Sequence, residues 1–426
     1  MRRRGILLLL DQDAGRERRF MQARHIMAAI SACLLMAAMV VGSVSFGYFM
    51  EPVTSDLGFD RAAFSLYFTI VTVVGGISLP VYGRLIPKVG VRKIAIVCGA
   101  LTGVFMACTS LCTSLPMFYG VAFLIGTTFF GCSYASMPVI VSTWFHEKTG
   151  FIIGCASATG GILGILSGFF YPSFIANMGW QAGYVLLGAI IAALTVPTGI
   201  ILLRNTPEEV GLRPYGRTNT IDKTQSSDSA VFSGVTMGEA FRMPSFWAVL
   251  ISLIILAFTA AVTQHLAAYF VSVGFDGVMA GIFMSVISGG LVITNILIGM
   301  ITDKLGVAKT LILSGVLYMI SFAILPLTIS VPVICVSLVL MSLGNGYVAV
   351  LAPLITQHLV GTKDYAAIWG VVSMVCVLGQ GIGSPIWGLV YDLTGSYNPA
   401  MFGAAIVVAL CSVELVVSMK SKRGNA

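Results

Sequence analysis

Charged residues are scarce in this chain, and their scarcity excludes a soluble globular protein. Only 10% of the residues are Asp, Glu, Lys or Arg, whereas 57% are hydrophobic and the mean hydropathy is +0.96. Soluble domains carry about 25% charged residues. The apolar segments are also continuous and do not alternate with polar residues, which excludes a transmembrane β-barrel.

Motifs for metal, haem and nucleotide chemistry are absent as well. The nine Cys residues lie in or beside apolar segments without a CxxC pair, and no His or acid accompanies Cys108 and Cys112. The Gly-rich strings at 154–168 and 378–388 lack the GK(S/T) ending of a phosphate loop. We therefore expect no metal and no cofactor, and we interpret these residues as helix-packing residues.

Long apolar segments are what the chain has in abundance. A membrane-spanning helix needs roughly 20 apolar residues, and twelve segments meet that requirement. They are expected at 25–50, 61–83, 94–114, 116–143, 150–174, 180–203, 244–272, 277–301, 308–330, 332–358, 364–391 and 398–418. The sequence thus predicts an all-α polytopic membrane protein with twelve transmembrane helices.

The longest polar stretch divides these spans into two sets of six. We expect an N-terminal half at 24–203, a central loop at 204–243 and a C-terminal half at 244–419. Residues 1–23 and 420–426 are expected to be cytoplasmic extensions. The basic start resembles a signal peptide, but its apolar run is too short for one, and both Met1 and Met21 remain candidate starts.

Positive charge appears in every second loop. Of the 24 Lys and Arg residues, 23 can be placed on one side of a membrane, and only Arg61 falls on the other. This positive-inside pattern predicts a multi-pass protein of the cell membrane with both termini in the cytoplasm. The net charge of +7 then faces anionic lipid headgroups, so we expect the lipid bilayer as a partner and no nucleic acid.

Landmarks recur between the two sets of spans at a nearly constant spacing. The pairs are Gly83 and Gly299, Tyr134 and Tyr347, and Gly154 and Gly370, at offsets of 216, 213 and 216 residues. Each copy has an even number of spans, so both keep the same orientation in the membrane. We expect two pseudo-symmetric halves around a central cavity lined by spans 1, 4, 7, 8, 10 and 11.

The loop between spans 8 and 9 reads GMITDKLGVAK and resembles the GxxxDxxGxxx(K/R) signature of the major facilitator superfamily. That resemblance implies the major facilitator fold. It also implies a cytoplasmic latch, made of Gly299, Asp303, Lys304, Gly306 and Lys309. The first-half copy has Pro87 where the acid belongs, so a symmetric pair of latches is not expected.

Shorter motifs resemble the monocarboxylate porter and oxalate:formate antiporter group. They lie at 42–49, 144–154, 179–180, 264–266 and 391–396. This resemblance carries over Tyr134, His265, Tyr347 and Trp369 as substrate-binding residues. Two positions depart from the group: Asn295 stands where these porters often carry Arg, and Val372 stands where oxalate-type members carry Lys.

Polar side chains inside the expected spans are few, and none is Lys or Arg. We expect His265 to be the main polar anchor for substrate or proton, because an imidazole can donate, accept or carry charge. Further candidates for substrate binding are Ser45, Tyr48, Gln264, Asn295, Asn345 and Gln380. Glu414 is expected to snorkel to the interface near Lys420.

These features predict a secondary active transporter, not an enzyme, that moves a small organic solute by alternating access as a monomer. The expected substrate is a monocarboxylate-like anion, with proton symport and anion exchange both open. A neutral or other small solute is one alternative, because no fixed cation is available in the spans. A non-transporting membrane sensor is another, although the central loop is short and polar for a signalling domain.

Overall fold

The computed structural model describes residues 2–216 and 234–421 and is almost entirely helical. Twelve helical segments in these ranges are long and apolar enough to cross a membrane. In hydrocarbon the backbone finds its hydrogen-bond partners only within helices or closed barrels, so continuously apolar segments form helices. The predicted all-α, twelve-span architecture is confirmed.

The N-terminal half contains spans 1 to 6. Its elements are α1 (Arg2–Leu57), α2 (Arg61–Val89), α3 (Val91–Cys108), η1 (Thr109–Leu111), α4 (Leu115–Cys132), α5 (Ser136–Trp144), α6 (Thr149–Pro197) and η2 (Thr198–Leu202). Helix α6 holds spans 5 and 6, which meet where Gly179 adopts φ 81° and ψ 162°. That positive φ suits glycine, because it has no Cβ.

The C-terminal half contains spans 7 to 12. Its elements are α7 (Met237–Ala240), α8 (Pro244–Ala260), η4 (Ala261–Gln264), α9 (Leu266–Ser272), α10 (Gly277–Leu305), α11 (Val307–Ile324), η5 (Leu325–Leu327), α12 (Val331–Met341), α13 (Leu343–Gly346), η6 (Tyr347–Leu351), α14 (Ala352–Val360), α15 (Tyr365–Thr394) and α16 (Asn398–Ser421). Span 7 is not the continuous helix expected at 244–272. Its α-helix gives way to a tighter turn at Ala261–Gln264, where the Thr263 hydroxyl donates to the Ala260 carbonyl and competes with the backbone ladder.

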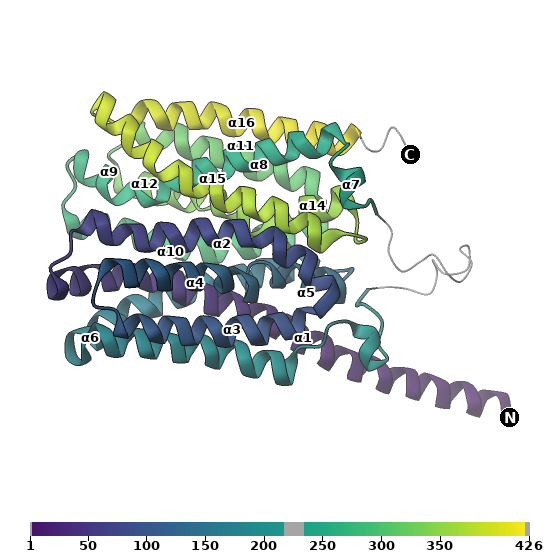
Figure 1. The fold of residues 1–426 in the computed structure, drawn as a ribbon. Helices are drawn as coiled ribbons and strands as arrows, with labels where there is room; N and C mark the ends of the chain where they lie inside the picture. Colours follow the sequence, from purple (N-terminus) through teal and green to yellow (C-terminus); the bar gives the residue numbers. More distant parts are fainter. Residues whose placement is uncertain (1, 217–233, 422–426) are drawn as a thin grey trace.

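The two halves lie side by side, with helices α1–α6 on one side and α8–α16 on the other (Figure 1). Across the boundary, α6 packs along α10 and α2 packs along α15. The described chain begins and ends at the same end of the bundle (Figure 1), which we name the terminal face. The other end, where α9 lies, is the opposite face.

Segments flanking the central loop are pinned to the terminal face. The η3 turn (Pro207–Val210) leads to Tyr215, which pairs with Phe145 between spans 4 and 5. Gly234 forms an antiparallel bridge with Gly361 between spans 10 and 11, whereas the Tyr215–Phe145 bridge is parallel. The intervening residues 217–233 of the expected central loop lie outside the described ranges. One end of the central loop is therefore fixed to the N-terminal half and the other end to the C-terminal half.

Candidate functional site

Glycines bring the two halves into backbone contact near the terminal face. A Cβ placed on Gly299 of α10 would overlap the carbonyl of Gly150 in α6. A Cβ on Gly83 of α2 would lie 2.5 Å from the carbonyl of Ala366 in α15. Separations below 3.0 Å leave no room for a side chain. The repeated landmarks Gly83 and Gly299 therefore each mark a close backbone approach of the halves on this side.

Asp303 joins the halves at the same level. Its Oδ1 accepts the backbone N–H of Gly150 at 2.8 Å, and its Oδ2 accepts that of Phe151 at 2.8 Å. These two amides belong to the first turn of α6, where N–H groups have no partner inside the helix. Lys148 adds an electrostatic attraction. The expected latch acid thus binds a helix N-terminus of the other half.

The remaining members of the expected latch do not share this contact. Gly306 ends α10 with φ 82°, a conformation that favours glycine. The side chains of Lys304 and Lys309 are exposed. The first-half copy, with Pro87 in place of the acid, provides no second carboxylate. The contact between α2 and α15 rests instead on the close approach at Gly83.

Deeper in the membrane, Tyr134 and Trp369 meet across the boundary. Their ring centroids are 5.8 Å apart, and the Trp369 indole N–H donates to the Tyr134 backbone carbonyl at 3.2 Å. Span 4 is interrupted here, between α4 and α5. Pro138 has no N–H with which to bond the carbonyl four residues earlier. The proline therefore leaves the Tyr134 carbonyl available to the other half.

A second bond of the same kind runs in the reverse direction. The Ser157 hydroxyl of α6 donates to the Ala349 carbonyl in η6 at 3.3 Å, and Pro353 follows Ala349 by four residues. Span 5 thus donates a hydrogen bond to span 10, and span 11 donates one to span 4. Sequence reasoning missed Ser157. The sequence feature that could have revealed this bond is the pair of prolines at repeat-related positions, Pro138 and Pro353, because each leaves a backbone carbonyl four residues earlier without its helical partner.

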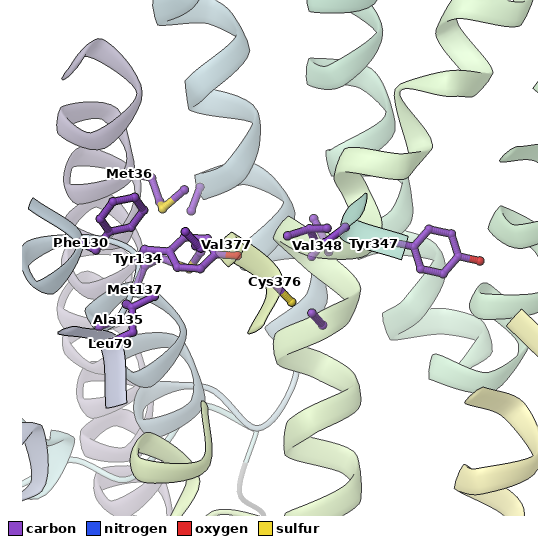
Figure 2. Packing of buried hydrophobic residues seen from close by; sticks show 14 of the residues in the cluster. Met36, Leu79, Phe130, Tyr134, Ala135, Met137, Tyr347, Val348, Cys376 and Val377 are labelled. Carbon is purple, nitrogen blue, oxygen red and sulfur yellow. The ribbon is translucent and has the colours of Figure 1, made fainter. Parts of the chain in front are cut away.

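The hydroxyl of Tyr134 and the amide oxygen of Asn295 are both buried without a hydrogen-bond partner among the residues that the structure describes. Asn295 is 4% exposed, and its backbone packs against Gly154 of the other half. Its Oδ1 lies on the side of Gly346 in α13. Figure 2 shows the Tyr134 hydroxyl directed toward Val377 and Cys376 of α15. Unpaired buried polar atoms cost free energy, so each position calls for a bonding partner.

Tyr347 does not mirror Tyr134 in space. Its hydroxyl donates to the Leu311 carbonyl at 2.8 Å and lies 3.1 Å from the Ser412 hydroxyl. Both partners belong to the C-terminal half, and the hydroxyl points away from Tyr134 (Figure 2). The repeat correctly pairs the two sequence positions, but span 10 turns its tyrosine into its own half.

His265 lies at the break in span 7, toward the opposite face. Its Nδ1 is 3.4 Å from the Tyr397 hydroxyl, and its ring packs near Gly388 of α15. Gly388 follows Trp369 by 19 residues, or roughly 28 Å along a helix axis. The structure therefore does not bring His265 together with Tyr134 and Trp369. The neighbouring Gln264 is exposed.

The other expected site residues are dispersed. Gln380 is half-buried in α15, and Asn345 is half-buried in α13. Tyr48 is half-buried and stacks on Tyr171 within the N-terminal half. The side chain of Ser45 lies outside the described residues.

Toward the opposite face the halves separate. Gly381 lies three helical turns beyond Gly370 on α15, and Gly281 lies five turns before Gly299 on α10, so each shares a face with its partner glycine. A Cβ on Gly370 would lie 2.7 Å from the Leu79 carbonyl, whereas one on Gly381 or Gly281 would have no atom within 4 Å. At these positions, the boundary is tightly packed near the terminal face and open further along α10 and α15.

A cavity of about 540 Å³ lies elsewhere, between α8, α15 and α16 of the C-terminal half. Its lining is apolar apart from Thr259, and it includes Trp387 and Ile386. The unpaired atoms of Tyr134 and Asn295 do not border it. We therefore place the candidate site at the boundary, where Tyr134 and Asn295 each carry a buried polar atom without a described partner, and not in this cavity.

The sequence profile of the Major Facilitator Superfamily matches residues 30–294 and 273–424. Among curated proteins, the chain is 24% identical to monocarboxylate transporter 13 of Rattus norvegicus, over 93% of this chain and 91% of that protein. It is 23% identical to the oxalate:formate antiporter of Oxalobacter formigenes, over 89% of this chain and 90% of that protein.

Solved structures share the fold. A variant of the E. coli fucose:proton symporter FucP superposes with a TM-score of 0.66 at 17% identity, covering 93% of this chain and 98% of that one. FucP in the outward conformation gives a TM-score of 0.64 at 15% identity, covering 93% and 99%. With its twelve spans, its paired halves and a profile match along most of its length, the chain belongs to the Major Facilitator Superfamily, whose members move small solutes across membranes.

Proposed function

We propose that this protein is a secondary active transporter of a small monocarboxylate, which binds at the boundary between the halves and is moved by alternating access. One observation carries the proposal: Tyr134 and Asn295, two residues that contact the other half, each have a buried side-chain polar atom without a described partner. A carboxyl group and an α-substituent would supply the missing partners. The similarity to a monocarboxylate transporter and an oxalate:formate antiporter supports the same substrate class.

The state of the boundary fits one step of such a cycle. The terminal face carries the Lys and Arg residues of the positive-inside pattern, so we assign it to the cytoplasm. Contacts at Gly150 and Gly299 then close the cytoplasmic side, and the separation at Gly281 and Gly381 opens the outer side. This is an outward-facing arrangement, in which solute would reach Tyr134 and Asn295 from outside through a cavity lined by spans 1, 4, 7, 8, 10 and 11.

A neutral solute is the second candidate, and the bonding chemistry at Asn295 favours it. The unpaired Asn295 oxygen needs a donor, and a carboxylate offers only acceptors. A solute with hydroxyl or N–H groups, or a monocarboxylic acid that arrives with its proton, satisfies this atom. Proton symport would deliver the acid in that form.

Uptake of labelled solutes into proteoliposomes tests the proposal. We expect saturable uptake of small monocarboxylates. Tyr134→Phe keeps the ring and the backbone carbonyl but removes the hydroxyl, and should raise KM about fivefold, equivalent to about 1 kcal/mol for one hydrogen bond. Asn295→Ala should do the same, whereas Asn345→Ala, a half-buried amide, serves as the matched control.

The outcomes separate the candidates. If neutral hydroxylated solutes inhibit uptake of the labelled solute and monocarboxylates do not, the neutral-solute function is correct. An unchanged KM in both Tyr134→Phe and Asn295→Ala would show that the solute does not bind at the boundary site. Collapse of uptake with a protonophore would indicate proton symport, whereas counterflow that resists the protonophore would indicate exchange.

A further inference from the structure

The cavity of about 540 Å³ in the C-terminal half lies where α15 and α16 separate. These two helices follow one another in the chain, yet within the described residues they do not pack along each other. Helix α8 packs along both of them and lies between them in Figure 1. The cavity is therefore a groove with α8 as its floor and α15 and α16 as its walls, which we name the span 11–12 groove.

The floor of the span 11–12 groove is tightly packed. A Cβ on Gly379 of α15 would lie 2.7 Å from the Ile254 carbonyl of α8, so the two backbones are in contact. Further along α15, the Trp387 indole reaches α8, where its N–H donates to the Phe258 carbonyl at 3.2 Å. Entry between α8 and α15 is therefore blocked at these positions.

The rims of the groove are continuous with the lipid-facing surface of the bundle. Ile382 and Ile386 of α15 border the groove and are exposed, and Phe402 and Ile406 of α16 are exposed beside it. Exposed apolar side chains on spanning helices contact lipid tails, which are as apolar as leucine. The groove is therefore an extension of the interface between this protein and the hydrocarbon of the membrane.

The depth of the groove places it near the opposite face. On α16 it runs from Ala400 to Val407, two to nine residues after Asn398, where span 12 begins. These positions lie roughly 3 to 14 Å along the helix. The whole hydrocarbon layer is about 30 Å thick, so this wall of the groove lies within one leaflet.

The polar groups at the groove already have hydrogen-bond partners. The Thr259 hydroxyl donates to the Leu256 carbonyl at 2.8 Å and accepts the Tyr318 hydroxyl at 3.4 Å. The Phe258 carbonyl is bonded by Trp387. A buried water needs about two to four polar partners, so the groove suits hydrocarbon and not water.

We propose that the span 11–12 groove binds one acyl chain of a phospholipid from the leaflet at the opposite face. Its volume of about 540 Å³ is more than three times the roughly 150 Å³ of an apolar cavity that holds one benzene, which leaves room for about 20 carbon atoms. That is close to the size of one acyl chain. A chain in the groove gains dispersion contacts with the floor and both walls, whereas a chain on a convex helix surface has contacts on one side.

Photo-crosslinking of the full-length protein in proteoliposomes tests the proposal. The probe is a phospholipid with a diazirine in the middle of one acyl chain, and peptide mass spectrometry locates the adducts. Val104 of α3 is the reference, because it is an exposed apolar residue within another span. We expect the adduct yield per residue at 400–407 to exceed that at Val104 by about fivefold, as a modest preference for the groove would give.

A filled groove should lose this labelling. A Cβ on Gly403 meets no atom within 4 Å, so Gly403→Leu fits the backbone and places its side chain in the groove. It should lower the yield at Ile382 and Ile386 to the level of Val104. Gly120→Leu on α4 also meets no atom within 4 Å and lies outside the groove, so it should label as the wild type does. Val407→Phe provides a second filling change if Gly403→Leu does not fold.

Three results would overturn the proposal. Wild-type labelling at 400–407 that equals labelling at Val104 would show that lipid covers the groove as it covers any other surface. An equal loss in Gly120→Leu and Gly403→Leu would show that the groove is not the binding site. Loss of the phospholipid adduct on addition of a small mole fraction of palmitate would identify a free fatty acid as the occupant. The inference goes beyond the proposed transport function, and none of these results depends on the transported solute.

Discussion

The indole of Trp369 donates a hydrogen bond to the backbone carbonyl of Tyr134, a residue 235 positions earlier in the chain. The bond joins the two halves of the transporter at a carbonyl that Pro138 cannot bond within its own helix. Ser157 and Ala349 repeat the arrangement with the halves exchanged. The proposed alternating access requires the halves to rock, so we expect these bonds to break when the observed state converts.

Trp369→Phe should destabilise the observed arrangement, which we propose to be outward-facing. It removes the N–H but keeps an aromatic ring against Tyr134, so the loss is one hydrogen bond, or about 1 kcal/mol. The ratio of outward to inward populations should fall about fivefold. Spin-label distances between the loops at 58–60 and 273–276 would measure it. Trp387→Phe is the control, since Trp387 donates to Phe258 within one half; an equal shift there would contradict the assignment.

Gly299→Ala should block closure of the terminal face. Its new methyl group would overlap the Gly150 carbonyl, and overpacking of this kind costs about 1–3 kcal/mol. We expect turnover to drop about tenfold while membrane insertion persists. Gly289→Ala on the same helix meets no atom within 4 Å and should transport normally. Normal turnover in Gly299→Ala would show that the close approach is dispensable.

Asp303→Asn should impair transport without preventing insertion. The change removes the negative charge that faces the N-terminus of α6 and one of the two strong acceptors, a loss of about 1 kcal/mol. Asp303→Ala should have a larger effect, because both amides lose their partner. Initial uptake rates at equal protein levels would measure this. Lys304→Ala, an exposed neighbour, should have little effect, and a similar loss there would point to loop charge instead of the helix contact.

His265→Ala should alter the pH dependence of uptake if His265 attracts the substrate near the outer entrance. A protonated imidazole pairs with an anion, so affinity should decline as rising pH removes the proton. The alanine variant should lose this dependence, and His265→Gln should keep some binding without it. Tyr397→Phe, which removes the hydroxyl 3.4 Å from Nδ1, should change the profile to a smaller extent. A wild-type pH profile in His265→Ala would remove His265 from the pathway.

Sequence alone determined the number of spans, their division into halves and the residues that correspond between them. Apolar length and loop charge are local properties, and a bilayer converts them directly into helices that cross it. The motif around Asp303 likewise located the terminal-face contact. It did not reveal that the partner is the N-terminus of α6, because that amide pair belongs to a helix about 150 residues away.

The tertiary structure decided which face each helix turns to its neighbours. Tyr134 and Tyr347 correspond in the repeat, yet one faces the other half and the other faces α11 and α16. His265 and Trp369 both looked like site residues, but helix length separates them by roughly 28 Å. Helix rotation and the packing of distant segments depend on contacts throughout the bundle, so periodicity along one segment cannot specify them.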